Sequence, residues 1–164
     1  MREKTCCFTG HRKLSLSENI VKDRLSKVLD NLIKDGIIYF GAGGALGFDT
    51  LASEVVLEKK SVYPQIKLIL VLPCPDQTKG WSYADIDKYN YILSRADKIV
   101  YTSEKFYKGC MHRRNRHLVN NSSCCICYLE NDTGGTAYTV GYANKNGLKI
   151  YNIASTNYME VFNA

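Results

Sequence analysis

The sequence has little proline, a single tryptophan and no long apolar segment. Among its 164 residues are 3 Pro and 1 Trp, and the longest apolar run, residues 66–72, is interrupted by Lys67. A run of that length cannot span a bilayer. The first residues also show no apolar segment of signal-peptide length and no small-residue cleavage site. We therefore expect a cytoplasmic protein with no membrane partner.

Acidic residues are also in short supply relative to basic ones. The chain has 16 Asp+Glu against 22 Lys+Arg, a formal net charge of +6. The remaining composition, 45% hydrophobic and 23% charged, is that of an ordinary globular protein and excludes a disordered, collagen-like or coiled-coil chain. The length predicts a single domain, residues 1–164, with a core that needs no disulfides. The excess of basic over acidic residues indicates an anionic partner.

Cysteine is present in an odd number, without a secretion signal, which argues against a disulfide framework. The seven are Cys6, Cys7, Cys74, Cys110, Cys124, Cys125 and Cys127. Cys124 and Cys127 have the spacing of a metal knuckle, but residues 124–129 have the composition of a buried strand. In a strand, residues three apart point to opposite faces. We therefore predict no metal site and interpret the cysteines as small buried hydrophobes.

Apolar runs alternate with segments of helical period along the whole chain. Strands are predicted at 5–9, 37–40, 66–72, 98–101, 124–129 and 148–153. Helices are predicted from Ser17 to Gly36 and at 48–60, 83–94, 111–120 and 136–146. Strands joined by crossover helices predict an α/β fold, a three-layer sandwich around a mostly parallel sheet of about six strands. Ligands of such sheets bind beyond the carboxyl ends of the strands.

The segments that follow the predicted strands are rich in glycine and in basic residues. These segments are 9–13, the glycine-rich 41–49, the basic 105–117, which contains no acid, and 132–136. Glycine lets backbone N–H groups approach an anion, and arginine contacts phosphate in bidentate fashion. We interpret the edge as a phosphate or nucleotide site. Helical spacing puts Arg113 and Arg116 on one face and Arg114 on another, so at most two of them address one site.

Each of these features also has a simpler explanation. A glycine-rich turn can serve only the tight packing of strand against helix, Thr136 can be a plain N-cap, and the arginines can form a solvated helix face. The glycine spacing is neither that of a P-loop nor that of a dinucleotide-binding fingerprint, which argues against an ATPase and an ordinary dehydrogenase.

Four segments together resemble the YpsA/YoqJ-type family of bacterial and phage proteins. They are Thr9–Arg12, Gly43–Ala52, Gly109–Arg116 and Gly134–Ala137. This family belongs to the SLOG superfamily, which unites the Smf/DprA proteins with the LOG phosphoribohydrolases. The resemblance implies a Rossmann-like fold, a nucleotide-derived ligand and a homodimer, with no cofactor expected. The candidate ligand-binding residues are Thr9, Gly10, His11, Arg12, Gly43, Gly44, Gly47, Asp49, Arg113, Arg116, Gly134, Gly135 and Thr136.

The resemblance leaves three functions open. Residues 135–143 are similar to the corresponding segment of nucleoside deoxyribosyltransferases and to the glycine-rich motif of the LOG phosphoribohydrolases. In both groups of enzymes a glutamate occupies the position of Thr139. A hydroxyl cannot stabilise an oxocarbenium-like centre as a carboxylate does. This favours a binding protein, a sensor or sequestering module, over an N-glycosidase or phosphoribohydrolase acting on nucleoside monophosphates, for which Asp49 is the catalytic candidate. Residues 44–52 are similar to the turn of DprA, which makes single-stranded DNA binding the second alternative.

Overall fold

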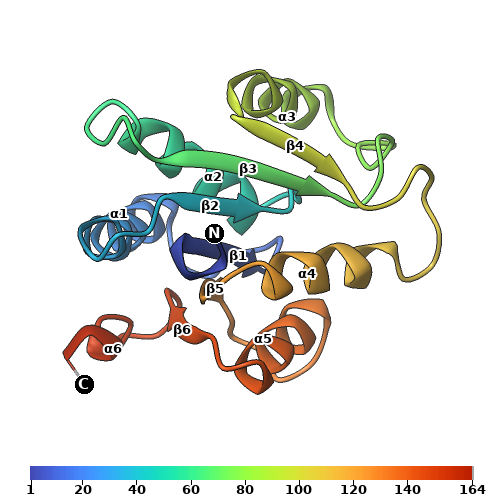
Figure 1. Ribbon diagram of the computed structural model, residues 1–164. Helices are drawn as coiled ribbons and strands as arrows, with labels where there is room; N and C mark the ends of the chain where they lie inside the picture. Colours follow the sequence, from blue (N-terminus) through green and yellow to red (C-terminus); the bar gives the residue numbers. More distant parts are fainter. Residues whose placement is uncertain (164) are drawn as a thin grey trace.

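A parallel sheet of six strands forms the centre of the computed structural model, which describes residues 1–163 (Figure 1). The strands are β1 (Thr5–Gly10), β2 (Tyr39–Ala42), β3 (Lys67–Leu72), β4 (Lys98–Tyr101), β5 (Cys124–Tyr128) and β6 (Lys149–Asn152). The helices are α1 (Glu18–Lys34), α2 (Phe48–Lys59), α3 (Tyr83–Arg95), α4 (Cys110–Asn120) and α5 (Gly135–Lys145), with the short η1 (Arg2–Lys4) and α6 (Glu160–Asn163) at the ends. The predicted α/β, Rossmann-like fold is confirmed.

The strand order β4-β3-β2-β1-β5-β6 decides where the helices lie. The chain moves in one direction from β1 to β4 and in the other from β5 to β6, and right-handed crossovers then place α1, α2 and α3 on one face and α4 and α5 on the other. Neighbouring helices on each face pack against each other, α1 and α3 on α2, and α4 on α5. The direction changes between β1 and β5, which is where ligands of such sheets commonly bind.

The core lies on both faces of the sheet. On the side of α1 and α2 the ring of Phe8 lies 6.2 Å from that of Phe40 and 6.3 Å from that of Phe48. On the side of α4 and α5 the core is smaller and includes Val119 and Ala143. The sheet thus buries its central strands on both faces, as expected for parallel strands with continuous apolar runs.

All seven cysteines are buried free thiols. The register of β1 and β5 pairs Cys6 with Cys124 and Cys7 with Cys125, so the thiols of neighbouring strands share a face. Burial raises the pKa of the Cys127 thiol to about 12. A buried protonated thiol is unreactive, which fits the interpretation of these cysteines as small hydrophobes.

Residues 1–163 contain neither a metal cluster nor a membrane-spanning helix. No group of three His, Cys, Asp or Glu side chains is arranged to hold a metal ion in this part of the chain. Among the helices described there, none is long and apolar enough to cross a membrane.

The predicted element boundaries differ from the observed ones by at most two residues, and the prediction for β4 is identical to the observed strand. For example, β2 begins at Tyr39 rather than at residue 37, and α4 begins at Cys110 rather than at residue 111. The sequence patterns missed only the short η1 and α6, which have too few residues to show a period.

Candidate ligand site at the carboxyl edge of the sheet

The main helices follow the carboxyl ends of the strands, but they begin in two different ways. Ser17 and Ser82 precede α1 and α3, and their hydroxyls accept hydrogen bonds from the N–H groups of residues 20 and 85. Glycine precedes α2, α4 and α5, at Gly47, Gly109 and Gly134, and supplies no side-chain cap. The first turns of α4 and α5 also contain no acid. Without a side-chain cap, a helix start can leave backbone N–H groups open to an anion. At α2 and α4, however, the first N–H groups, those of Phe48 and Cys110, already donate to the carbonyls of His11 and Tyr107 at 3.1 Å.

The turn between β2 and α2, residues 43–47, is here called the inner turn. A Cβ added to Gly43 would lie 2.4 Å from Nη1 of Arg114, and one added to Gly47 would lie 2.2 Å from the carbonyl oxygen of Arg12. Gly47 also has a φ of +81°, which disfavours any other residue. The glycines of the inner turn therefore make room for other parts of the protein.

The end of β1 is packed in the same way. A Cβ on Gly10 would lie 2.5 Å from Cβ of the fully buried Phe48, whose N–H donates to the carbonyl of His11 at 3.1 Å. The Nε2 of His11 accepts from the backbone N–H of Glu130 at 2.9 Å, and Thr9 is buried within β1. His11 thus ties the loop after β1 to the loop after β5 across the point where the strand order reverses.

The guanidinium group of Arg114 packs against the inner turn. Arg114 is only 4% exposed, its Nη1 donates to the carbonyl of Gly43, and its Nε donates to Oδ1 of Asn115 at 2.7 Å. Burial lowers the pKa of Arg114, and the charge of Asp49 opposes that shift. Helical spacing correctly predicted that Arg114 lies on a different face of α4 from Arg113 and Arg116. It did not predict that the face of Arg114 is the one turned towards the site.

A signal for Arg114 was present in the sequence. Cys110, Arg114 and Leu118 are four residues apart, so they share one face of α4, and all three are buried. The two apolar neighbours indicate that this is the face packed on the sheet. A charged residue between them is therefore inside the protein, where it needs a partner.

Asp49 is enclosed beneath the inner turn. It is 6% exposed, and its Oδ2 accepts the N–H of Ala45 at 3.3 Å, while its Oδ1 is buried without a partner. Burial raises the pKa of Asp49 to about 6, although Arg114, the N–H groups of Ala45 and Gly43, and Arg12 all act to lower it. The hydrogen bond of this carboxylate is made to the backbone of the inner turn, so Asp49 holds that turn in shape.

The segment that leads from β5 into α5, residues 131–136, is here called the outer turn. A Cβ added to Gly134 or to Gly135 would meet nothing within 4 Å. Gly134 has a φ of +101°, which explains why it is glycine, but Gly135 has no positive φ. Neither packing nor backbone conformation within the described protein accounts for Gly135, and the space above it is open.

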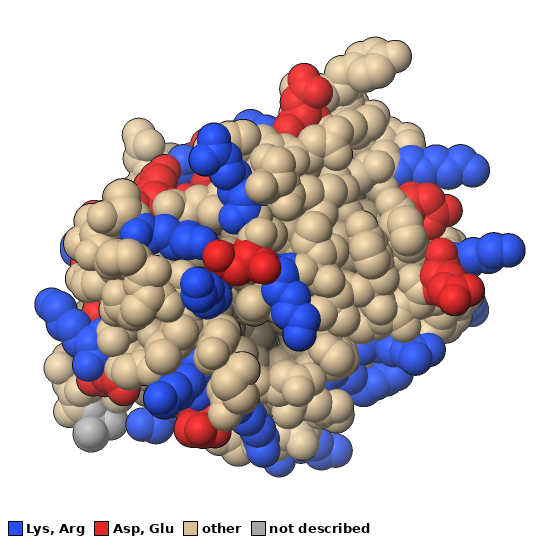
Figure 2. All heavy atoms as spheres, turned by 45° about the horizontal axis from the view of Figure 1, so that its top comes forward, with Lys and Arg blue, Asp and Glu red and all other residues tan. Residues whose placement is uncertain are grey.

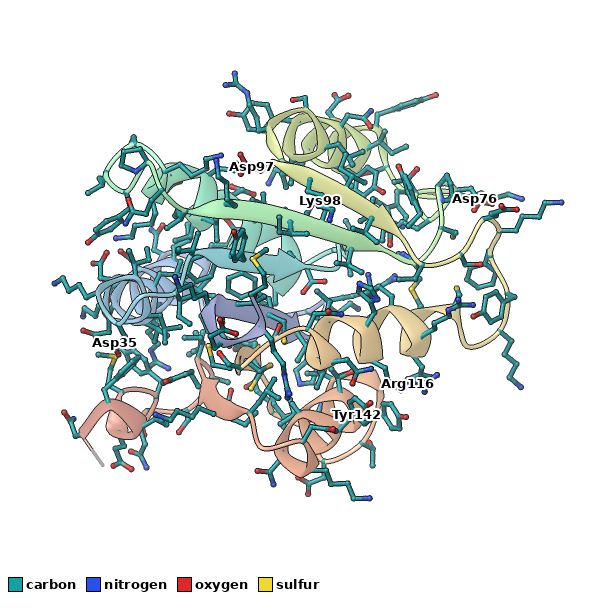
Figure 3. The ribbon with its side chains drawn as sticks, in the orientation of Figure 1. Asp35, Asp76, Asp97, Lys98, Arg116 and Tyr142 are labelled. Atoms are coloured by element: carbon teal, nitrogen blue, oxygen red, sulfur yellow. The ribbon has the colours of Figure 1, made fainter. Side chains whose placement is uncertain are left out.

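Side chains of α4 meet the first turn of α5 beside the outer turn. The Nη1 of Arg116 donates to the hydroxyl of Tyr138 at 3.1 Å, and the edge of the His112 ring contacts the Tyr138 ring at 4.6 Å between centroids. Figure 3 shows Arg116 on α4 directed towards α5, near Tyr142. Arg113 is not part of these contacts, because it is exposed and lines a separate hollow with residues 102–107.

A hollow of about 500 Å³ lies on the other side of the inner turn. Its lining mixes cations, acids and leucines: Arg12, Lys13, Leu14, Leu16, Glu18, Leu46, Gly47, Thr50, Leu51, Glu54, Asp85 and Lys88. Its volume is in the range of small-molecule pockets. Arg12 and Gly47 are the two predicted site residues that it contains.

Most of the predicted site residues therefore belong either to a packed part or to an open part, while Arg12 and Arg113 line two separate hollows. Thr9, Gly10, Gly43, Gly44, Gly47 and Asp49 belong to the packed part, whereas Arg116, Gly134, Gly135 and Thr136 belong to the open part. Figure 2 shows that Lys and Arg side chains are frequent along the lower edge of the face it displays, with few acids between them.

Comparison with known proteins shows what this chain is similar to. The model of the YspA SLOG family matches residues 6–160. A UPF0398 protein of Bacillus thuringiensis strain Al Hakam is 29% identical over 155 residues, which cover 88% of this chain and 84% of that protein. The prophage-derived protein YoqJ of Bacillus subtilis strain 168 is 30% identical over 138 residues, covering 76% of this chain and 81% of YoqJ.

Two solved structures of DNA processing protein A (DprA) share the fold. The protein from Helicobacter pylori, which binds single-stranded DNA, superposes with a TM-score of 0.64 at 21% identity, over 89% of this chain. The protein from Streptococcus pneumoniae superposes with a TM-score of 0.65 at 17% identity, over 98% of this chain. The chain spans only 63% and 56% of these two DprA chains, respectively.

Proposed function

Because the chain belongs to the YspA SLOG family, we propose that it binds a phosphorylated nucleotide or nucleotide-derived ligand at the carboxyl edge of its sheet. The observation that carries this proposal is the open start of α5, where Gly135 has neither a packing contact nor a strained backbone. A glycine at that place lets a phosphate approach the N–H groups of the first helical turn. The protein would act as a sensor or a sequestering module.

Two groups of side chains suit such a ligand. Arg116 lies beside the first turn of α5 and can add a bidentate contact to a phosphate held there. The hollow at Arg12 and Gly47, which is lined by cations, acids and leucines, offers polar and apolar contacts to another part of the ligand. In this proposal the phosphate lies at the outer turn, and Asp49 acts only by holding the inner turn in shape.

A thermal-shift panel of nucleotides, dinucleotides and ADP-ribose derivatives tests the proposal. A ligand at 100 times its dissociation constant stabilises the folded state by about 2.7 kcal/mol. Arg116→Ala should reduce the shift, whereas Lys145→Ala, an exposed cation at the far end of α5, should leave it unchanged. The proposal fails if no member of the panel stabilises the wild-type protein.

Single-stranded DNA is the second candidate ligand, favoured by exposed aromatic rings near cations. Phe106 is 61% exposed, Tyr107 41% and Tyr138 45%, and the first two share a hollow with Lys105 and Arg113. Bases stack on such rings while cations contact the phosphates. DNA affinity should fall steeply with salt, whereas the affinity for a ligand with two phosphates should fall only slightly. Phe106→Ala should weaken DNA binding and leave nucleotide binding unchanged.

The enzymatic alternative has less support in the geometry. Thr139 is buried, and its hydroxyl donates to the carbonyl of Gly135 at 2.9 Å, so this hydroxyl is already engaged within α5. Asp49 is enclosed beneath the inner turn. We expect nucleoside monophosphates to stay intact on long incubation. Release of free base that is lost in Asp49→Asn would establish hydrolysis instead. The homodimer and the cytoplasmic location stay predictions.

A further inference from the structure

One part of the sheet lies uncovered on the side of α4 and α5. On that face α4 packs on β1 and β3, and α5 packs on β1, β5 and β6. Figure 1 shows β3 and β4 with no helix in front of them. Both faces of a parallel sheet are normally covered by helices, because its strands are apolar on both sides. The layer formed by α4 and α5 therefore stops short of the edge strand β4.

An apolar groove of about 230 Å³, here called the open groove, lies in this uncovered region. Its floor consists of side chains that alternation along β3 and β4 places on one face, Ile69, Val71 and Val100. Leu118 of α4 forms one wall, and Gly41 of β2 lies beneath it. The groove thus runs between α4 and the edge of the sheet.

The charged side chains that line the open groove are cations, and the α-ammonium of Met1, which also lines it, is paired with Glu3 at 3.0 Å. Arg2 and Lys98 line it, and no Asp or Glu does. Lys67 lies on the same strand face as Ile69, two residues before it. Within residues 1–163, no ion pair involves any of these three cations.

The acid closest in sequence to Lys98 is already engaged. Asp97 is held by Nζ of Lys60 at 2.6 Å and accepts the N–H of Leu68 at 2.8 Å. Figure 3 shows Asp97 and Lys98 side by side at the start of β4. Lys67 and Lys98 are therefore available to an external carboxylate, whereas Nε of Arg2 already donates to the carbonyl of Ser122 at 3.1 Å.

We propose that the open groove docks an amphipathic helix of a partner protein, with an apolar stripe flanked by Asp or Glu. A helix is the element that covers a parallel sheet elsewhere in this fold, and the apolar floor needs an apolar stripe. The cations of the rim select acidic flanks by charge complementarity. A second copy of this chain fits less well, because two such grooves facing each other would bring Arg2 and Lys98 of both copies together.

The test uses a displayed library of helical peptides that have a constant apolar stripe and randomised flanking positions. Selection on the purified full-length protein should enrich peptides with Asp or Glu at the flanks. Binding of the best peptide should fall at least tenfold in Lys98→Glu, whose site is exposed, and in Val100→Glu. Lys145→Glu, an equal charge change on the remote end of α5, should bind as the wild type does. Thermal unfolding of each variant checks that the fold is kept.

Three outcomes would overturn the proposal. The first is a selection that enriches nothing, or that enriches flanks without acidic residues. The second is a peptide whose binding is unchanged in Lys98→Glu, since it then lies elsewhere. The third is a wild-type dimer in sedimentation that becomes a monomer in Lys98→Glu or Val100→Glu, because the groove would then hold a second copy of the chain.

Discussion

The inner and outer turns both contain glycines at the start of a helix, and both lie at the same edge of the sheet. The reason why glycine occurs differs between the two turns. In the inner turn, Gly43 faces the guanidinium of Arg114 and Gly47 faces the backbone of Arg12. In the outer turn, Gly134 and Gly135 face open space. The same residue type thus serves packing in one turn and leaves access in the other. Only the surroundings of the missing Cβ separate the two cases.

The largest effect on stability is expected from Gly47→Ala. The new Cβ would meet backbone atoms of Arg12 and would sit at a positive φ, so steric overlap and strain both act. We expect a loss of about 4 kcal/mol in the free energy of unfolding, measured by urea denaturation. Gly134→Ala is the matched control, because this position also has a positive φ but its new Cβ would meet no other atom. We expect it to lower the free energy of unfolding by about 2 kcal/mol. Equal losses in both variants would contradict the comparison.

The next effect separates two arginines of α4. Arg114→Ala should cost about 3 kcal/mol, because it leaves the carbonyl of Gly43 without its donor and removes the cation whose charge acts most strongly on the buried Asp49. Arg116→Ala should change stability by less than about 0.5 kcal/mol and act on ligand binding instead. Urea denaturation and the thermal-shift panel measure the two effects.

A double variant sharpens this prediction. Gly43→Ala forces the guanidinium of Arg114 aside, so its cost should shrink in an Arg114→Ala background. Additive losses would mean that the two residues do not share the inner turn.

The pH dependence of stability tests the enclosure of Asp49. Its pKa in the folded protein is about 6, above the ordinary value of 3.8, so folding favours the protonated form. Its contribution to stability is therefore present at low pH and is lost as the pH rises between these two values, by at most about 3 kcal/mol. Relative to Asp49→Asn, which does not titrate, the wild type should lose stability across that window in urea denaturation. Parallel pH profiles would show that Asp49 is open to solvent.

The fold could be predicted from the sequence because its signals are local. Apolar runs, helical periods and the glycines or serines at helix starts lie within a few residues of the elements that they define. The predicted order of strands and helices therefore agrees with the structure from β1 to β6, and only the short η1 and α6 are missing from it.

The candidate site could be predicted only in part because it depends on distant contacts. The spacing of Cys110, Arg114 and Leu118 indicates that Arg114 is buried, but no local pattern indicates that its partner is a carbonyl 71 residues earlier in the chain. The sequence identified the glycines of both turns but could not tell which of them face protein atoms and which face solvent. The open groove could not be predicted for the same reason. It exists because the helix layer of α4 and α5 does not extend over β4, and only the folded structure shows that.

The most direct test of the open outer turn is Gly135→Ala, with stability and ligand binding measured on the same protein. Because the new Cβ meets nothing, we expect a free energy of unfolding equal to that of the wild type or up to about 1 kcal/mol higher. The nucleotide that stabilises the wild type most should bind about tenfold more weakly, a loss of about 1.4 kcal/mol, since the methyl group blocks the approach of phosphate to the helix start. Unchanged binding in this stable variant would contradict the placement of the ligand at the outer turn.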